Sequence, residues 1–136
     1  MAIKTGVGTV LKMNGTTVAN ITNISGPTMS KETVDTTALD TTGGYKTFIT
    51  GLKNPGTLTI NVMFDKDGYY TLKQGFDSDT PATFEIELPD RITTSGSKLT
   101  FSGLITEIPL TIPPGDKITC DVTIQISGAV TFTKAV

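Results

Sequence analysis

The sequence predicts an all-β protein, a β-sandwich or partly open barrel with one short flanking α-helix and a long hairpin arm. The first observation is a period-two alternation of apolar and polar residues, which is typical of strands that bury one face. The second is a set of Asn, Pro and Gly turns between these segments, and the third is an abundance of β-branched residues. With 136 residues, the chain is expected to form a single domain, residues 1–136, around one hydrophobic core.

Three segments carry the clearest strand pattern: Thr57–Phe64, Phe84–Leu88 and Lys117–Gln125. In each of them the even-numbered positions are apolar, and the odd-numbered positions are almost all polar. Side chains alternate between the two faces of a strand. We therefore expect the even-numbered side chains to be buried and the odd-numbered ones to form a polar face.

Five further strands are predicted from weaker patterns: Gly8–Met13, Thr17–Ile24, Lys31–Thr37, Tyr45–Gly51 and Lys98–Ile108. A bulge or bend at Gly103 is expected to interrupt the last of them. Turn sequences separate the strands, and Asn14-Gly15 is typical of a tight hairpin.

One stretch, Asp65–Phe76, has helical spacing. An acidic residue can cap its start, Tyr69, Leu72 and Phe76 share one face, and the region of Gly75 can end it. These features predict a short helix at about residues 66–76.

A long hairpin arm is predicted at about residues 29–50. Its tip, Thr36–Gly44, is polar and glycine-rich, whereas strand-like residues flank the tip on both sides. Little in the tip can bury enough surface to offset the entropy lost on ordering. We therefore expect the arm to be mobile until a partner binds it.

The sequence lacks the residues of most catalytic and metal sites. It contains no His, which excludes Ser-His-Asp and Cys-His machinery, and its one cysteine, Cys120, excludes a thiolate zinc cluster and is expected in the core. Glu85 and Glu87 share one strand face, the minimum geometry for an acid–base pair or a calcium site, but a solvated strand face is the alternative. No catalytic, metal or cofactor-binding residue is predicted, and we do not expect an enzyme.

Charge and hydropathy give three further expectations. The N-terminus lacks the apolar core of a signal peptide, and no apolar run is long enough to cross a bilayer. The chain is therefore expected to stay in the cytoplasm after synthesis. A net charge of −2 and scattered basic residues argue against a nucleic-acid-binding surface.

Several motifs follow one another in a characteristic order. Ser25-Gly26-Pro27 leads into the Glu-, Asp- and Thr-rich stretch Ser30–Asp40, and the turn Gly51–Gly56 precedes the strand up to Phe64. A helix with the spacing Tyr-x-x-Leu comes next. Then follow the strands Phe84–Leu88 and Gly103–Ile108 and a last strand that ends at Gly128. This order, over nearly the whole chain, resembles the tail tube proteins of long-tailed bacteriophages.

The resemblance implies a structural virion subunit whose fold is related to the tube protein of type VI secretion. Such subunits form hexameric rings that stack into the hollow tail tube through which DNA passes into the host. The implied partners are further copies of the chain, a tape-measure protein, and tail tip or terminator proteins. The resemblance also implies that the subunit is assembled in the host bacterial cytoplasm and is located in the virion tail. It further implies that DNA passes without specific binding, and that the chain neither inserts into a membrane nor uses a cofactor.

The resemblance also defines two sets of candidate site residues. The inter-ring arm set comprises Glu32, Val34, Asp35, Leu39, Asp40 and Tyr45. The candidate lumen-facing set comprises Glu85, Glu87, Glu107 and Asp121. Acidic or neutral polar walls let a duplex slide, whereas basic walls would bind its phosphates. Alternation alone leaves open which polar face looks inward.

The alternative function is a β-sandwich binding module for carbohydrate or for surface interaction. Sugar binding usually uses exposed aromatic side chains. The chain has no Trp, and Tyr45, Tyr69 and Tyr70 fall in the predicted arm and helix.

Overall fold

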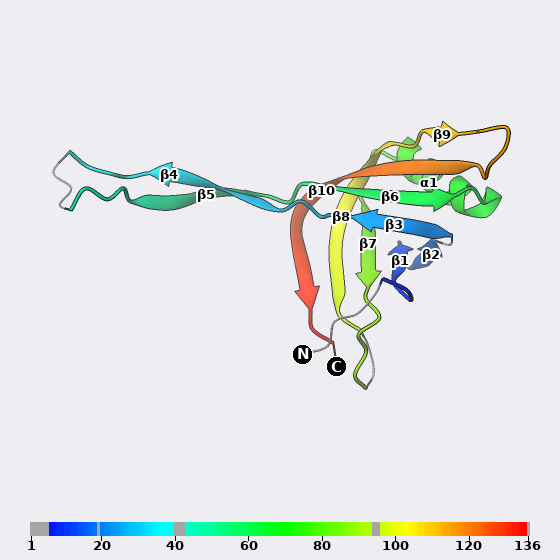
Figure 1. Ribbon diagram of the computed structural model, residues 1–136, viewed down its shortest axis with the longest axis horizontal. Coiled ribbons are helices and arrows are strands. Elements are labelled where there is room, and N and C mark those ends of the chain that lie inside the picture. Colours follow the sequence, from blue (N-terminus) through cyan, green and yellow to red (C-terminus); the bar gives the residue numbers. More distant parts are fainter. Residues whose placement is uncertain (1–5, 19, 40–42, 94–95, 136) are drawn as a thin grey trace.

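The computed structural model describes residues 6–18, 20–39, 43–93 and 96–135 of the chain. Their strands form one curled eight-stranded sheet and a separate two-stranded hairpin that projects from it (Figure 1). One helix, α1 (Lys66–Asp77), lies among the described residues. The predicted all-β class with one short helix and a hairpin arm is confirmed.

The large sheet follows the order β2-β1-β7-β8-β10-β6-β3, and β9 pairs with β10. All its neighbouring strands are antiparallel. The bounds are β1 (Val10–Met13), β2 (Thr16–Val18), β3 (Ile21–Ser25), β6 (Thr57–Met63), β7 (Ala82–Glu87), β8 (Lys98–Glu107), β9 (Leu110–Thr111) and β10 (Thr119–Thr133). The edge strands β2 and β3 are consecutive in the chain, and they lie near each other because the sheet curls into a partly open barrel (Figure 1).

The segment Thr17–Ile24, predicted as one strand, forms two strands at opposite edges of the sheet. Asn20, between them, has a φ of 62°, a left-handed conformation that breaks a strand and that Asn tolerates better than most residues. The predicted Asn14-Gly15 hairpin is confirmed, since the two residues have φ of 51° and 85° and join β1 to β2.

The core contains the even-numbered side chains of β6 and β7, and those of β10 as far as Ile126, as alternation predicts. Leu58, Phe84 and Ile124 are fully buried. Three predicted core residues at segment ends, Phe64, Leu88 and Ile118, are instead exposed. Each lies one residue beyond its strand, where the sheet no longer covers the side chain.

β8 runs without interruption through Gly103, contrary to the predicted break. Its register against β10 shifts elsewhere, between Thr123 and Ile124 and between Ser127 and Thr131. A Cβ on Gly103 would lie 2.7 Å from Ile124 Cγ2. The glycine therefore permits close packing at the core and does not bend the strand.

Helix α1 confirms the predicted cap, because the Asp65 carboxylate accepts a hydrogen bond from the Gly68 amide at 3.1 Å. Leu72 is buried and Tyr69 packs against the core, but Phe76 is exposed. Gly75 does not end the helix, which continues to Asp77. No helix among the described residues is long and apolar enough to span a membrane.

The arm consists of β4 (Ser30–Asp35) and β5 (Phe48–Asn54), which continue from β3 and into β6 (Figure 1). Its paired part therefore extends four residues beyond the predicted end at residue 50. Every residue of β4 is exposed, and so is every residue of β5 except Gly51. With both faces in solvent, the arm gives no burial pattern from which strand bounds can be read.

Candidate functional site

The side chains that alternate with core residues in β1, β7, β8, β10 and β6 share one side of the sheet, called here the polar face. Glu85 lies opposite Lys12 on β1 and opposite Thr100 on β8, and Asp121 lies opposite Asn61 on β6. Directly opposite residues in an antiparallel ladder point to the same side. Uncharged members of the polar face are Thr57, Thr59, Thr83, Thr100, Ser102, Thr123 and Gln125.

The register places all four candidate lumen-facing carboxylates on the polar face. Glu85 and Asp121 lie between buried neighbours, and Glu87 follows buried Ile86. Glu107 lies opposite Thr123, next to the bulge that separates it from buried Ile105. The structure thus brings together on one surface residues from three strands.

Two lysines that sequence reasoning missed share this face. Lys98 Nζ lies 3.3 Å from Glu85 Oε1 and 3.7 Å from Glu87 Oε2, and Lys12 lies opposite Glu85. The two glutamates are therefore balanced by two ammonium groups. The remaining carboxylates, Glu107 and Asp121, leave the polar face weakly acidic. Alternation predicted the phase of these strands, but only their register could have revealed the lysine partners.

The arm presents apolar side chains without a covering surface. Val34 lies opposite Ile49, and both are exposed. Glu32 lies over Gly51, where a Cβ would be 3.1 Å from the glutamate Cβ. The register shifts between Lys31 and Thr33, so that the ladder is bulged beside Glu32.

At the end of β4, just before the arm tip, the Asp35 carboxylate accepts a hydrogen bond from the Thr37 amide at 2.8 Å. Hydrogen bonds from the Thr37 side chain and backbone hold the pKa of Asp35 below its ordinary value. Leu39 and Tyr45 are exposed. Asp40, the remaining predicted arm residue, lies outside the described residues.

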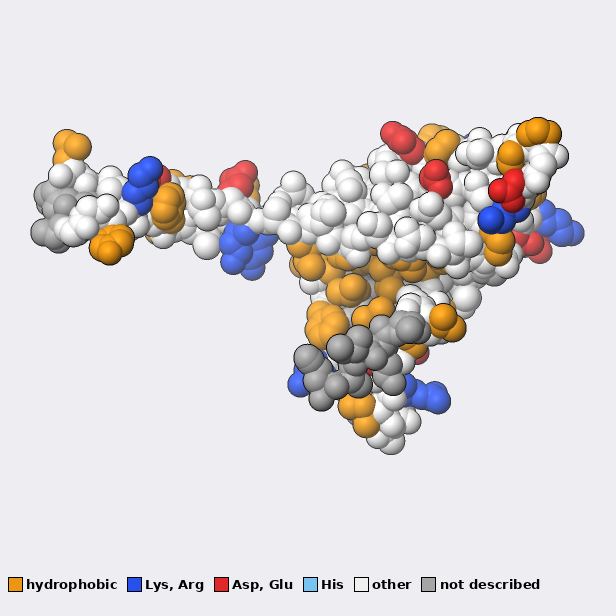
Figure 2. Space-filling view, viewed as in Figure 1, with side chains coloured by type: hydrophobic (Ala, Val, Ile, Leu, Met, Phe, Trp, Pro, Cys, Tyr) orange, Lys and Arg blue, Asp and Glu red, His pale blue; other side chains and the backbone are white. Residues whose placement is uncertain are grey.

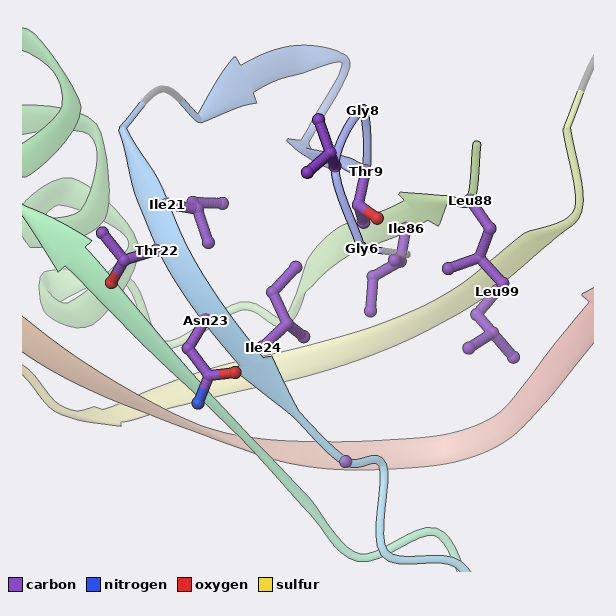
Figure 3. Close-up of a pocket in the computed structure, with 12 residues that line it drawn as sticks. Gly6, Gly8, Thr9, Ile21, Thr22, Asn23, Ile24, Ile86, Leu88 and Leu99 are labelled. Carbon is purple, nitrogen blue, oxygen red and sulfur yellow. The ribbon is translucent and has the colours of Figure 1, made fainter. Parts of the chain in front are cut away.

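An open groove of about 720 Å³ lies where the barrel fails to close, between β3 and the ends of β7 and β8 (Figure 3). Ile24, Ile86 and Leu99 line it, and none of its described lining residues is titratable. Such a groove lacks the charged groups from which a catalytic site is built.

The cysteine Cys120 lies in the core, as expected, with 2% of its surface exposed. Its burial, and to a smaller extent the charge of Asp121, raises the pKa of its thiol.

The curled sheet has one buried face, one threonine-rich face and a projecting exposed hairpin, so the subunit offers broad surfaces for contact with further subunits. The sequence matches the model of the lambda phage tail tube protein family over residues 7–133. The chain belongs to this family, as the resemblance read from the sequence implied. Its members are structural tube proteins, and the chain is accordingly a component of a phage-type tail.

Solved structures share the fold. The chain is similar to a chain of the virion of a native gene transfer agent particle, with a TM-score of 0.76, 22% identity, and 96% of this chain and 99% of that chain covered. It is also similar to a chain of the sheath/tube terminator of PVC, an extracellular contractile injection system, with a TM-score of 0.77, 11% identity and 98% of both chains covered. A chain of an empty gene transfer agent tail with C6 symmetry gives a TM-score of 0.67 at 22% identity, covering 92% and 93%. No curated protein matches the sequence.

Proposed function

We propose that this chain forms hexameric rings that stack into the hollow tube of a phage-type tail, with the polar face toward the lumen and residues 1–136 acting as one domain. The observation that carries the proposal is the polar face, which crosses β1, β7, β8, β10 and β6 without a buried apolar position. Six-fold symmetry is supported by the similar gene transfer agent tail, which has C6 symmetry.

The chemistry of the polar face suits the passage of DNA. Double-stranded DNA carries about one negative charge per 1.7 Å of its axis, so a basic wall would hold it through counterion release. Here the charges of Lys12 and Lys98 are offset by Glu85 and Glu87. Threonine hydroxyls and a small acidic excess leave the duplex without a strong electrostatic attraction.

The arm then serves as the contact between rings. Val34, Ile49 and Leu52 are exposed apolar residues on a hairpin that the body of the subunit does not cover. Burying them against a neighbouring ring would stabilise the stack by the hydrophobic effect. In the isolated chain, the same exposure leaves the arm mobile.

The proposed tube places the chain in a virion tail that is assembled in the host bacterial cytoplasm. Its neighbours would be further copies of itself, a tape-measure protein along the lumen, and tip or terminator proteins at the ends. The similarity to a chain in the structure of a sheath/tube terminator of a contractile injection system supports contact with proteins at the tube end. The chain contributes shape and surface to this assembly and no catalysis.

Electron microscopy of the concentrated protein tests the proposal. The wild-type chain is expected to give rings or hollow filaments, whereas a binding module would remain a monomer. A variant that lacks residues 36–43 should keep the circular dichroism of the wild type, because the core lies outside the arm. The same variant should form no filaments. Normal filaments from the deletion variant would show that the arm does not make the contact between rings.

A further inference from the structure

A second groove, of about 710 Å³, lies beside the root of the arm. One wall is formed by arm-root residues, among them Met29, Lys31 and Lys53, and the other by Gly128–Val130 of β10. We call it the arm-root groove. It combines an apolar interior with two ammonium groups at its border, which is a suitable surface for an extended peptide that carries both an apolar side chain and a carboxylate.

The two lysines are placed unfavourably for an isolated subunit. Lys31 and Lys53 lie directly opposite each other in the β4–β5 ladder, and like charges in this position destabilise a strand pair. Neither forms an ion pair with any residue in the described part of the chain. Figure 2 shows positive side chains gathered at the root of the arm. A carboxylate from outside the subunit would relieve this repulsion.

The backbone beside the groove is also incompletely paired. β10 pairs with β6 only as far as Gln125, and the last hydrogen bond on that side joins the Ile126 amide to Gly56 O at 3.2 Å. From Ser127 to Thr133, the ladder within the described residues runs to β8 alone. An exposed strand edge of this kind accepts backbone hydrogen bonds from an added segment.

The opposite end of the same arm has the complementary chemistry. The carboxylate of Asp35 lies at the last ladder pair before the tip, and the tip itself carries the fully exposed side chain of Leu39. Resting on the proposed tube function, we propose that the arm-root groove binds the arm tip of a second copy of this chain. Asp35 of one copy then lies near Lys31 and Lys53 of the next, and Leu39 enters the apolar groove.

The positions of the two ends support this assignment. The arm extends away from the body, with its tip far from its root (Figure 1). A contact between tip and root is heterologous, because the two copies use different surfaces. Each added copy offers a new root and a new tip, so the contact can repeat from copy to copy, and it forms an open stack where the rotation between copies does not close a ring. An open repeat of this kind is what stacking of rings requires.

Disulfide trapping in assembled tubes tests the proposal. The variant Leu39→Cys/Ala129→Cys places one thiol at the tip and one in the groove, and native Cys120 is buried. Mild oxidation of its tubes should give a ladder of linked chains on a non-reducing gel. The matched control is Leu39→Cys/Asp67→Cys, because Asp67 is exposed in the first turn of α1, beyond the end of β6 that lies far from the arm (Figure 1). It should give no ladder.

Charge reversal gives the second measurement. Adding Lys31→Glu/Lys53→Glu to the trapping variant should lower the rate of linkage at least about tenfold, because the carboxylate then meets like charge. Reversal of two other lysines, Lys66→Glu/Lys134→Glu, should leave that rate within about twofold. Tubes that form without the ladder, or an equal ladder in the Asp67 control, would overturn the groove assignment and leave the tube intact. Failure of the wild-type chain to form any tube would overturn the proposed function itself.

Discussion

At the residue scale, two glycines lie where the helix and the strands of the body pack most closely. A Cβ on Gly75 of α1 would meet the end of Met13 and lie 2.9 Å from Ile105 Cδ1, so the helix rests on the sheet at this point. Gly103 has the same role within the sheet. Sequence patterns place a glycine in a turn or a bend by default, because close packing depends on contacts that are distant in the chain.

The substitution Gly103→Ala is predicted to lower the free energy of unfolding by about 1–3 kcal/mol, as overpacked cores do. The added methyl group would lie 2.7 Å from Ile124 Cγ2 and 3.1 Å from Gln125 O. Urea denaturation followed by circular dichroism measures the change. Gly115→Ala is the control, because no atom lies within 4 Å of its Cβ position. Equal stability of the two variants would show that the β8–β10 packing is looser than described.

Cys120 is predicted to be unreactive in the folded protein. Burial raises the pKa of its thiol above the ordinary value, and only the thiolate reacts. At pH 8, labelling by a thiol reagent should be on the order of 100-fold slower in buffer than in denaturant. Because folding raises the pKa of this thiol, its protonated form contributes to the free energy of unfolding. That contribution is fully present below the pKa of the unfolded chain and is lost as the pH rises through the pKa of the folded protein. A Ser127→Cys variant, exposed on the same strand, should label rapidly, and equal rates at both positions would contradict burial.

At the element scale, predictability follows burial on one face. β6, β7 and β10 are recognised from alternation because one face of each strand contacts the core. β4 and β5 have no buried face, so their bounds were misplaced by a few residues. The two-residue strand β9 was missed, since so short a segment has no period. The same holds for the candidate site. Alternation places Glu85 and Glu87 on the polar face, but their ion-pair partner Lys98 is distant in the sequence and is found only from the structure.

The same contrast predicts the dynamics of the arm. In the monomer, amides of β4 and β5 should exchange with solvent roughly 100-fold or more faster than those of β6, because the arm can open without exposing the core. Hydrogen exchange followed by mass spectrometry measures both segments in one sample. Sedimentation must first verify that the sample is monomeric. Protection of the arm equal to that of β6 in such a sample would show that the hairpin is rigid before assembly.

At the scale of the whole molecule, the sheet separates two kinds of surface. Its inner face and α1 hold the core, so most of the stability of the subunit comes from residues outside the polar face and the arm. Those two surfaces are free to serve assembly and transport. The polar face remains weakly acidic only while Glu85 and Glu87 balance Lys12 and Lys98, which makes this balance the most sensitive point of the proposed lumen.

The double substitution Glu85→Gln/Glu87→Gln tests the orientation of the polar face. It keeps the side-chain size and removes ion pairs that are partly exposed and contribute about 0–1 kcal/mol each, so folding and tube formation should persist. Lys12 and Lys98 then lose their partners in every subunit, so the polar face as a whole becomes neutral and the wall around the two lysines becomes locally basic. DNA should bind this wall in a salt-dependent way, so phage with these tails should eject DNA slowly at low salt and recover at high salt. Asp77→Asn/Asp79→Asn makes the same change of charge around the end of α1 and should leave ejection unchanged. If the glutamine variant ejects normally at low salt while its tubes are intact, the polar face looks outward and another surface lines the channel.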